Sequence, residues 1–274
     1  MATADGGRKR VLVTGGGTFL GDAIAAALLA EGADVTLLVR PDSARPDAPP
    51  LSVSDRLGSL ADRARWFTAD VWDPASLKGH GRGHDVAIHT IGGMRADPAQ
   101  GLTYQYLNVV SARNVANMCV SSGVGHLILI SAARAPWVQH GYIAAKREAE
   151  AYLTRIGLAH TIIRAPILYV RGRPRSLYYR LMTWLRIVPP FSWLGLNAAA
   201  PMPIDIMARG AARVALDSVR TKAIYTAGDL RKRNTWRERR RGSAYLSAPA
   251  DLPRARRPID RLDDESGFGW TPPK

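Results

Sequence analysis

The chain has 274 residues, 46% of them hydrophobic, and a formal net charge of +15 at pH 7. This length is enough for one large domain with its own buried core. The sequence has no long apolar run and no signal-peptide segment at its start, so we expect no membrane-spanning helix. Its single cysteine, Cys119, excludes an internal disulfide. We expect a cytoplasmic protein, with the inner face of a membrane as the alternative location.

The positive charge suggests a nucleic-acid partner, but its distribution argues against one. Residues 230–274 carry twelve Lys or Arg against six Asp or Glu, and the only dense basic cluster is residues 231–241. No helix-turn-helix, zinc-finger or aromatic-repeat pattern accompanies this cluster. We therefore expect a basic tail with little order beyond Gly228 and no specific nucleic-acid partner. Peripheral contact with an anionic membrane is the alternative.

A strand, a tight turn and a helix are predicted at the start of the chain. Residues 10–14 are aliphatic and β-branched, a glycine cluster follows, and then comes an Ala/Leu-rich helical segment. In such a turn Gly15 would allow the sharp bend, and Gly16 or Gly17 would let a pyrophosphate approach the backbone. Gly21 would let the helix pack closely on the strand. This pattern predicts a site for a dinucleotide.

The first turn of that helix would complete the site. A helix N-terminus carries N–H groups without intrahelical acceptors and the positive end of the helix dipole. We expect the amides of Phe19 and Leu20 to face a phosphate in this way. Thr18 precedes them, and its hydroxyl can donate to the phosphate, although its Cβ narrows the approach.

The second predicted strand, residues 33–40, ends in a basic residue. A protein that selects NAD usually has Asp or Glu at this position to hold the ribose hydroxyls. Here the residue is Arg40, with Arg45 nearby, and a guanidinium suits the 2′-phosphate of NADP(H). We expect NADP, with NAD as the alternative cofactor. A simple surface charge is the alternative role for Arg40.

The third predicted strand, residues 65–69, is followed by Asp70 and Val71, which we expect at the adenine end of the cofactor. The Asp70 carboxylate could accept a hydrogen bond from the adenine amino group. Asp73 and the proline after it have the residue types of a helix N-cap and first turn, so a short helix is predicted from there. A glycine-rich stretch with two histidines, residues 79–84, fits a surface turn better than a metal site.

The fourth predicted strand covers residues 85–91 and runs into two glycines. Thr90, Ile91 and Gly92 therefore stand where a parallel strand opens space for a ligand, and we assign them to cofactor binding. His89 lies within the apolar run and is interpreted as a packed core histidine rather than a base. A helix is predicted over residues 102–122.

A fifth strand, residues 126–131, leads to the candidate catalytic pair. Tyr142 and Lys146 are four residues apart, which places them on one face of a helix. An ammonium group there would lower the pKa of the phenol and make it a usable proton donor. Ser131, at the exit of the strand, could share the substrate carbonyl.

These residues give the chain a resemblance to the atypical branch of the short-chain dehydrogenase/reductase superfamily, over residues 10–228. The marks are residues 14–21, Asp70, the Tyr142 and Lys146 pair, and residues 161–166. The resemblance implies a doubly wound, parallel-sheet Rossmann fold of α/β class that binds NADP(H), with Pro166 beside the nucleotide.

Within that branch the chain looks most similar to a quinone-linked group that includes the accessory nucleotide-binding subunit of complex I and an accessory protein of ubiquinone biosynthesis. The segments that carry this likeness are residues 142–150 and 201–208. The chain departs from the superfamily pattern in two places. Thr18 replaces the middle glycine of the fingerprint, and Ser131 stands only eleven residues before Tyr142.

We expect three regions: a dinucleotide-binding core at 1–166, a helical substrate or lid region at 167–229, and the basic tail at 230–274. The leading hypothesis is an oxidoreductase that acts on a carbonyl in a small apolar or quinone-like substrate. Tyr142 would supply the proton and Lys146 would hold the nicotinamide ribose. The alternative is a non-catalytic nucleotide-binding accessory protein of a respiratory or quinone-biosynthesis assembly. Neither hypothesis requires a metal.

Overall fold

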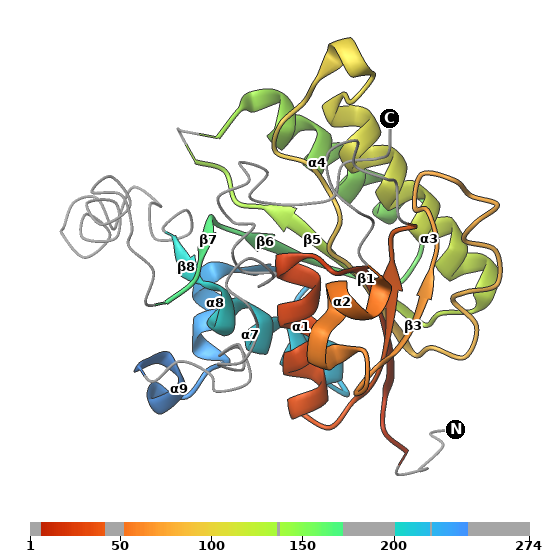
Figure 1. Cartoon of the computed structure of the whole chain (residues 1–274). Helices are drawn as coiled ribbons and strands as arrows, with labels where there is room; N and C mark the ends of the chain where they lie inside the picture. The colour runs from red at the N-terminus through yellow and green to blue at the C-terminus, as the bar shows by residue number, and fades with distance from the viewer. Residues whose placement is uncertain (1–6, 42–51, 136–137, 172–200, 220, 241–274) are drawn as a thin grey trace, which may run out of the picture.

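A computed structural model describes residues 7–41, 52–135, 138–171, 201–219 and 221–240. In these residues seven strands form one parallel sheet in the order β3-β2-β1-β4-β5-β6-β9 (Figure 1). The strands are β1 (Arg10–Gly16), β2 (Asp34–Val39), β3 (Arg65–Thr68), β4 (Val86–His89), β5 (His126–Ala132), β6 (His160–Ala165) and β9 (Ile224–Thr226). A second, two-stranded sheet pairs β7 (Leu168–Tyr169) with β8 (Met202–Pro203).

Helices cover both faces of the large sheet (Figure 1). The longer ones are α1 (Phe19–Ala30), α3 (Ser111–Ser122), α4 (His140–Arg155) and α7 (Ile204–Leu216). The short ones are α2 (Val53–Leu57), η1 (Gly58–Leu60), η2 (Pro98–Gln100), α8 (Ala227–Lys232) and α9 (Trp236–Arg240). A π-helix, η3 (Gln105–Val110), runs directly into α3.

Strand alternation decides which helices cover which face. Val11 and Val13 of β1 pack into a core with α1 and α7, whereas Leu12 between them packs into a second core with α3 and α4. Because both faces are buried, the strands read as continuous aliphatic runs rather than as alternating ones. The predicted doubly wound α/β fold is confirmed. Its strand order reverses between β1 and β4, which is where such sheets bind ligands.

Two local predictions were wrong. The residues after Asp73 form successive turns instead of a helix, with i to i+3 hydrogen bonds such as Lys78 N–H to Ala75 O. Asp73 accepts a hydrogen bond from the N–H of Ala75, so it caps a turn. Residues 41–63, whose Pro-, Ser- and Asp-rich composition predicts an irregular connection, contain α2 and η1, while residues 42–51 lie outside the described residues.

Helix α3 also differs from its prediction, which covered residues 102–122. It ends before Gly123 as expected, and Gly123 takes the left-handed conformation, φ 72°. However, Leu102 pairs with Asp97 in a bridge, and the helix begins as the π-helix η3. Single-turn π-helices occur often at functional sites, because the extra residue re-aims nearby side chains.

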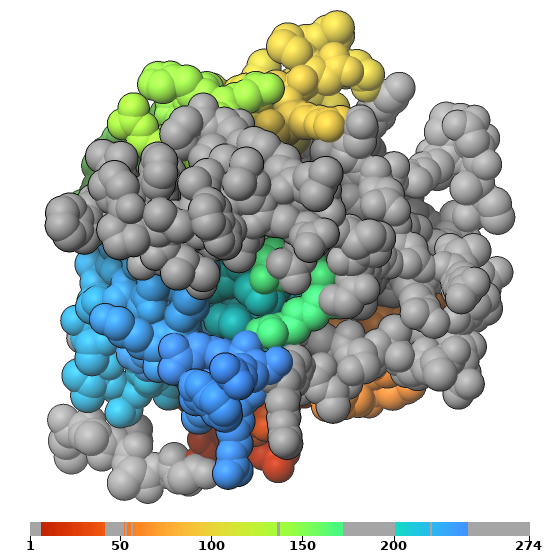
Figure 2. Space-filling model, turned by 90° about the vertical axis from the view of Figure 1, so that its left-hand side faces the viewer, coloured from red at the N-terminus to blue at the C-terminus, as the bar shows by residue number. Residues whose placement is uncertain are grey.

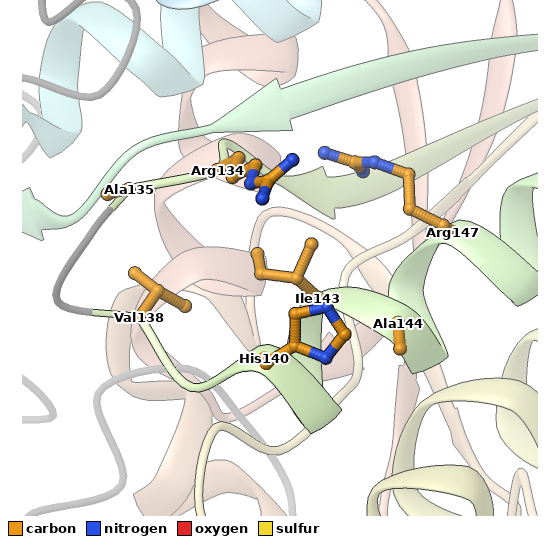
Figure 3. Close-up of a pocket in the computed structure, with 7 residues that line it drawn as sticks. All are labelled: Arg134, Ala135, Val138, His140, Ile143, Ala144 and Arg147. Atoms are coloured by element: carbon orange, nitrogen blue, oxygen red, sulfur yellow. The ribbon is translucent and has the colours of Figure 1, made fainter.

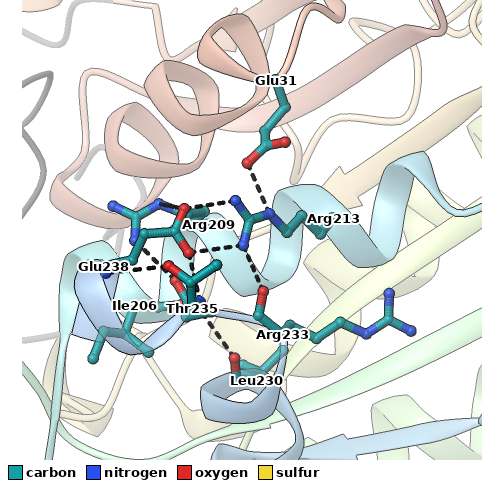
Figure 4. Close-up of polar contacts among 9 residues, drawn as sticks. Glu31, Ile206, Arg209, Arg213, Leu230, Arg233, Thr235 and Glu238 are labelled. Carbon is teal, nitrogen blue, oxygen red and sulfur yellow. Dashed lines mark hydrogen bonds and ion pairs between the residues drawn. The ribbon is translucent and has the colours of Figure 1, made fainter.

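The prediction of little order beyond Gly228 is wrong as far as residue 240. Leu230 of α8 is fully buried against α7, and Asn234 donates hydrogen bonds to Ile206 O and Leu230 O. Arg213 of α7 pairs with both Glu31 and Glu238 (Figure 4). These contacts make residues 229–240 part of the folded body.

The same C-terminal helices reach the start of the predicted substrate region. The side chain of Arg171, two residues after β7, donates to Asp205 Oδ1 at 3.1 Å and to Arg239 O at 2.8 Å. Figure 2 shows α8 and α9 (blue) on the surface beside β7 (green). Residues 172–200 and 220 of the predicted substrate or lid region lie outside the described residues, as does the tail from 241.

Candidate functional site

The glycine turn after β1 has the geometry predicted for it. Gly15 has φ +90°, and a Cβ there would lie 2.5 Å from Thr90 Oγ1. A Cβ on Gly21 would lie 2.1 Å from Gly15 O, so helix α1 and strand β1 meet too closely for any side chain. Gly17 also has a positive φ, of 78°. The turn therefore depends on glycine at these positions.

Thr18 has a different role from the predicted one. Its Oγ1 donates to Gly15 O at 2.5 Å and accepts from Gly21 N at 3.2 Å, which makes it the N-cap of α1. The hydroxyl proton is thus held by the loop itself instead of facing a phosphate. The amides of Phe19 and Leu20 begin the helix and have no carbonyl one turn earlier within it. These two amides are the donors that the loop can present to a diphosphate.

Asp22, which the sequence reasoning missed, lies beside the same loop. Its Oδ1 accepts from Gly17 N at 2.8 Å, and its Oδ2 is buried without a hydrogen-bond partner among the described residues. Burial raises its pKa to about 8, and the bond from Gly17 opposes this shift. An acidic residue in the first turn of a helix next to a glycine cluster was the available signal.

The end of β4 forms the opposite wall of the switch point. Thr90 donates from Oγ1 to Thr14 O at 2.5 Å, which ties β4 to β1. His89 is fully buried, with Nδ1 2.9 Å from Thr14 Oγ1 and Nε2 3.5 Å from Ser111 Oγ. Burial lowers the pKa of His89 to about 3, with a smaller contribution from the charge of Lys146. The interpretation of His89 as a neutral core histidine is confirmed.

The predicted adenine end is formed by apolar residues next to a turn. Val71 and Ile91 are buried in the same core. Asp70 accepts a hydrogen bond from Trp72 N at 2.9 Å through Oδ1, so part of its carboxylate already caps the turn after β3. Its predicted contact with an adenine amino group stays a prediction.

The two remaining assigned residues follow other strands at this edge of the sheet. Arg40 comes directly after β2 and is half-buried, and Pro166 comes directly after β6 and is buried. Both stand at carboxyl ends of parallel strands, where a nucleotide would lie. Arg45 lies outside the described residues.

Lys146 and Asn108 converge on Gly92. A Cβ on Gly92 would lie 2.4 Å from Lys146 Nζ and 2.4 Å from Asn108 Oδ1, so only glycine leaves both groups in place. Lys146 makes long hydrogen bonds to Ile91 O (3.5 Å) and Ile130 O (3.3 Å), and burial lowers its pKa to about 8.

Asn108 is a second residue that the sequence reasoning did not assign to the site. Its Nδ2 donates to Gly93 O and to Tyr104 O, both at 3.0 Å, while its buried Oδ1 has no partner among the described residues. A buried acceptor without a donor is costly unless a ligand or water satisfies it. Nothing in the sequence signalled the π-helix that aims this side chain.

Tyr142 and Lys146 share one face of α4, as predicted, but the expected effect on the phenol is wrong. Burial raises the pKa of Tyr142 well above its usual range, and the charge that opposes this shift is that of Arg147. The phenol therefore stays protonated at neutral pH and holds its proton more tightly than a solvent-exposed tyrosine does. Its hydroxyl forms no hydrogen bond with the described residues, so its proton is available to a substrate.

Ser131 lies in a different polar cluster. It donates to Glu150 Oε1 at 2.6 Å and accepts from Arg147 at 3.2 Å. Glu150 is buried and also pairs with Arg164 at 2.6 Å. The neighbouring residue Ala132 is the one that packs with Tyr142. The structure therefore ties the hydroxyl proton of Ser131 to Glu150, which does not support its predicted role on a substrate carbonyl.

These observations satisfy what a dinucleotide needs at the end of a parallel sheet: two helix amides, a glycine turn that a Cβ would fill, and two inward polar groups over Gly92. Residues 15–182, more than half of the chain, match the family described as NAD(P)H-binding. The chain belongs to the NAD(P)H-binding family. This match confirms the NAD(P)-binding part of the resemblance that the sequence shows.

Several individual proteins are similar to this NAD(P)H-binding chain. It is 27% identical over 242 residues to the "ceramide reductase" of Caulobacter vibrioides, covering 87% of this chain and 71% of the relative. A short-chain dehydrogenase/reductase from Serratia marcescens matches with TM-score 0.57 and 16% identity, covering 79% and 94% of the two chains. A UDP-Glc/GlcNAc 4-epimerase from Campylobacter jejuni matches with TM-score 0.55 and 15% identity, covering 82% of each chain. At these identities the two structures show the shared fold alone.

Two further features of the described residues bear on the site. They contain no group of three or more His, Cys, Asp or Glu side chains placed to hold a metal ion. His80, from the glycine-rich stretch of residues 79–84, stacks on Phe67 with ring centres 4.1 Å apart. No helix in the described ranges has the length and apolar character needed to cross a bilayer.

Proposed function

We propose that this protein is an NADPH-dependent reductase of a carbonyl group in an apolar, lipid-like substrate. The observation that carries the proposal is the placement of Tyr142, Lys146 and Asn108 at the switch point, beside the glycine turn. The relative named ceramide reductase supports a lipid-like substrate.

The residues at the switch point would have two roles, binding of the cofactor and donation of a proton. Lys146 and Asn108 would hold the nicotinamide ribose, the first as donor and the second through its unpartnered Oδ1 acceptor. Tyr142 would give its phenolic proton to the substrate oxygen, and the charge of Arg147, which opposes the rise of its pKa, would favour that transfer. A bound nicotinamide supplies the hydride for such a reduction. Tyr142 packs in an apolar cluster with Ala132 and Ile143.

The choice of NADPH over NADH rests on Arg40. Its position after β2 is where the adenine ribose of a bound dinucleotide would lie, and its guanidinium can pair with a 2′-phosphate through two parallel hydrogen bonds. NADP therefore stays the preferred cofactor of the proposal, with NAD as the second.

The quinone-linked resemblance makes quinones the second substrate class to test. Membrane contact and the role of a non-catalytic accessory protein stay predictions from the sequence. The accessory role needs bound nucleotide but no protonated phenol facing an apolar wall, so the geometry at Tyr142 favours the reductase.

A substrate panel tests the proposal. Purified protein would be mixed with NADPH and with long-chain ketones, an N-acylated 3-oxo long-chain base and short-chain quinones, while the loss of NADPH absorbance is followed. We expect turnover with at least one long-chain carbonyl. Binding of NADPH without turnover on any member of the panel would contradict the reductase and favour the accessory protein.

A further inference from the structure

A pocket of about 710 Å³ opens at the start of α4, outside the set of residues assigned above to the nucleotide. Its walls combine four apolar residues with three basic ones. They come from the loop after β5 and from one face of α4. The lining residues are Arg134, Ala135, Val138, His140, Ile143, Ala144 and Arg147 (Figure 3).

This pocket adjoins the proposed reaction centre. Val138 and Ile143 line it and also pack in the same apolar cluster as Tyr142. Arg147 lines it as well, and its charge lowers the pKa of the Tyr142 phenol against the effect of burial. A substrate whose carbonyl met Tyr142 would therefore extend into this pocket.

The pocket has more basic side chains than acidic partners to pair with them. Figure 3 shows the side chains of Arg134 and Arg147 pointing toward one another from the loop and from α4. Arg134 is exposed and forms no ion pair with any described residue. Arg147 pairs with Glu150, but the same carboxylate also holds Arg164. Two guanidinium groups thus share the Glu150 carboxylate, and Arg134 adds a third positive charge at the pocket without an acidic partner among the described residues.

Arginine pairs in this arrangement suit an oxyanion. A guanidinium offers up to five N–H donors in a planar fork, and two forks that face each other can bind one phosphate or carboxylate. The hydrogen bonds of Arg147 use its two terminal nitrogens and leave Nε without a bond to a described residue. The apolar residues Val138 and Ile143 can cover hydrocarbon beside that oxyanion.

We propose that this pocket binds the anionic head of an amphipathic substrate, a phosphate or a carboxylate, with Arg134 and Arg147 as its ligands and the adjoining apolar wall against its chain. The inference rests on the proposed function for the identity of the reacting group, since it places the carbonyl at Tyr142. The binding of the anion itself is separate from turnover and from the nucleotide.

Binding of simple amphiphiles tests the proposal. Full-length protein saturated with NADP⁺ would be titrated by calorimetry with monododecyl phosphate, dodecanoate, dodecanol and inorganic phosphate. The variants are R134Q and, as a matched control, R155Q, which removes an exposed arginine from the last turn of the same helix α4. We expect R134Q to lower the affinity for the two dodecyl anions about tenfold or more and to leave the affinity for dodecanol unchanged. R155Q should behave as wild type.

Each result of these titrations tests a different part of the proposal. Equal binding of dodecyl phosphate by wild type and R134Q would overturn the proposal, and so would dodecanol that binds as tightly as either dodecyl anion. If inorganic phosphate bound as tightly as dodecyl phosphate, the proposed contact between the apolar wall and the hydrocarbon chain would be wrong. A preference for one anion over the other identifies the head group. If the protein bound dodecyl phosphate through Arg134 but never oxidised NADPH, this inference would be supported and the proposed reductase activity would be contradicted.

Discussion

The ammonium nitrogen of Lys146 lies 5.9 Å from the centre of the Tyr142 ring, one helical turn away on α4. Both side chains are buried, and both pKa values shift toward the neutral form: that of Lys146 falls to about 8, and that of Tyr142 rises. Desolvation, rather than attraction between the two groups, dominates this pair. The consequence is a phenol that keeps its proton and a lysine that needs a ligand.

Replacing Tyr142 with phenylalanine tests the phenol as the proton donor. We expect turnover to fall by about a hundredfold or more, since general acid catalysis contributes on that scale. The affinity for NADPH should not change, because the hydroxyl forms no hydrogen bond with the described residues. Steady-state kinetics on the best substrate of the panel and a fluorescence titration with NADPH would measure the two effects. Unchanged turnover would exclude Tyr142 as the donor.

Replacing Lys146 with methionine tests the cost of burying the ammonium group. The pKa of Lys146 is about 8 when folded, against an ordinary value of 10.5. Between these values the unfolded chain binds more protons, so this group makes wild-type stability rise with pH. The variant lacks that rise. It should be more stable than wild type by about 3 kcal/mol at pH 7, and the difference should shrink toward pH 10.5.

Urea unfolding at several pH values would measure this difference. Lys78→Met, which removes an exposed lysine, serves as the control and should follow the wild-type curve. If the Lys146 variant were less stable than wild type at pH 7, the hydrogen bonds to Ile91 O and Ile130 O would outweigh desolvation. The picture of an ammonium group that awaits a ligand would then be wrong.

Arg40→Ala tests the selection between the two cofactors. We expect the affinity for NADPH to fall about tenfold or more, because a charge-assisted pair with the 2′-phosphate is lost. The affinity for NADH, which lacks that phosphate, should change little. Parallel titrations of both cofactors would show the effect as a change in their ratio. An unchanged ratio would mean that Arg40 is a surface charge at the end of β2.

Removing C-terminal residues tests how far the folded body extends. A chain that ends at Gly228 loses Leu230, which is fully buried, and Glu238, which pairs with Arg213. We expect it to be unstable, while a chain that ends at residue 240 should unfold at the wild-type temperature. Leu230→Ala should cost about 2–5 kcal/mol. Thermal unfolding followed by circular dichroism measures all three. Equal stability of the two truncated chains would contradict the packing of α8.

The strands and the glycine turn could be predicted from the sequence because their residues leave few alternatives. Fully buried parallel strands need aliphatic runs, as residues 10–14 and 126–131 show, and a turn without room for a Cβ needs glycine. Helix α8 carried a readable signal as well. Thr226 and Asp229 form a capping box, but the surrounding arginines made the segment look like a solvated tail.

The rest of the site depended on contacts that spacing does not reveal. The distance of eleven residues from Ser131 to Tyr142 does not say which side of β5 faces the phenol; the structure gives that place to Ala132. Asn108 reaches the site from within the π-helix η3, which the spacing of the residues did not predict. The N-cap role of Thr18 followed from its residue type and position, yet the likeness to a glycine fingerprint made a phosphate contact the first interpretation.

The central claim is that the turn between β1 and α1 binds a dinucleotide, and a titration with NADPH tests it most directly. Wild type, Gly21→Ala and the control Gly228→Ala would be compared by cofactor fluorescence after circular dichroism has shown that each is folded. A Cβ on Gly228 meets its nearest neighbour at 3.7 Å, whereas one on Gly21 would lie 2.1 Å from Gly15 O. The account predicts saturable binding by wild type and the control and its loss in Gly21→Ala. A folded wild type that binds neither NADPH nor NADH, or a Gly21→Ala variant that binds as wild type does, would contradict it.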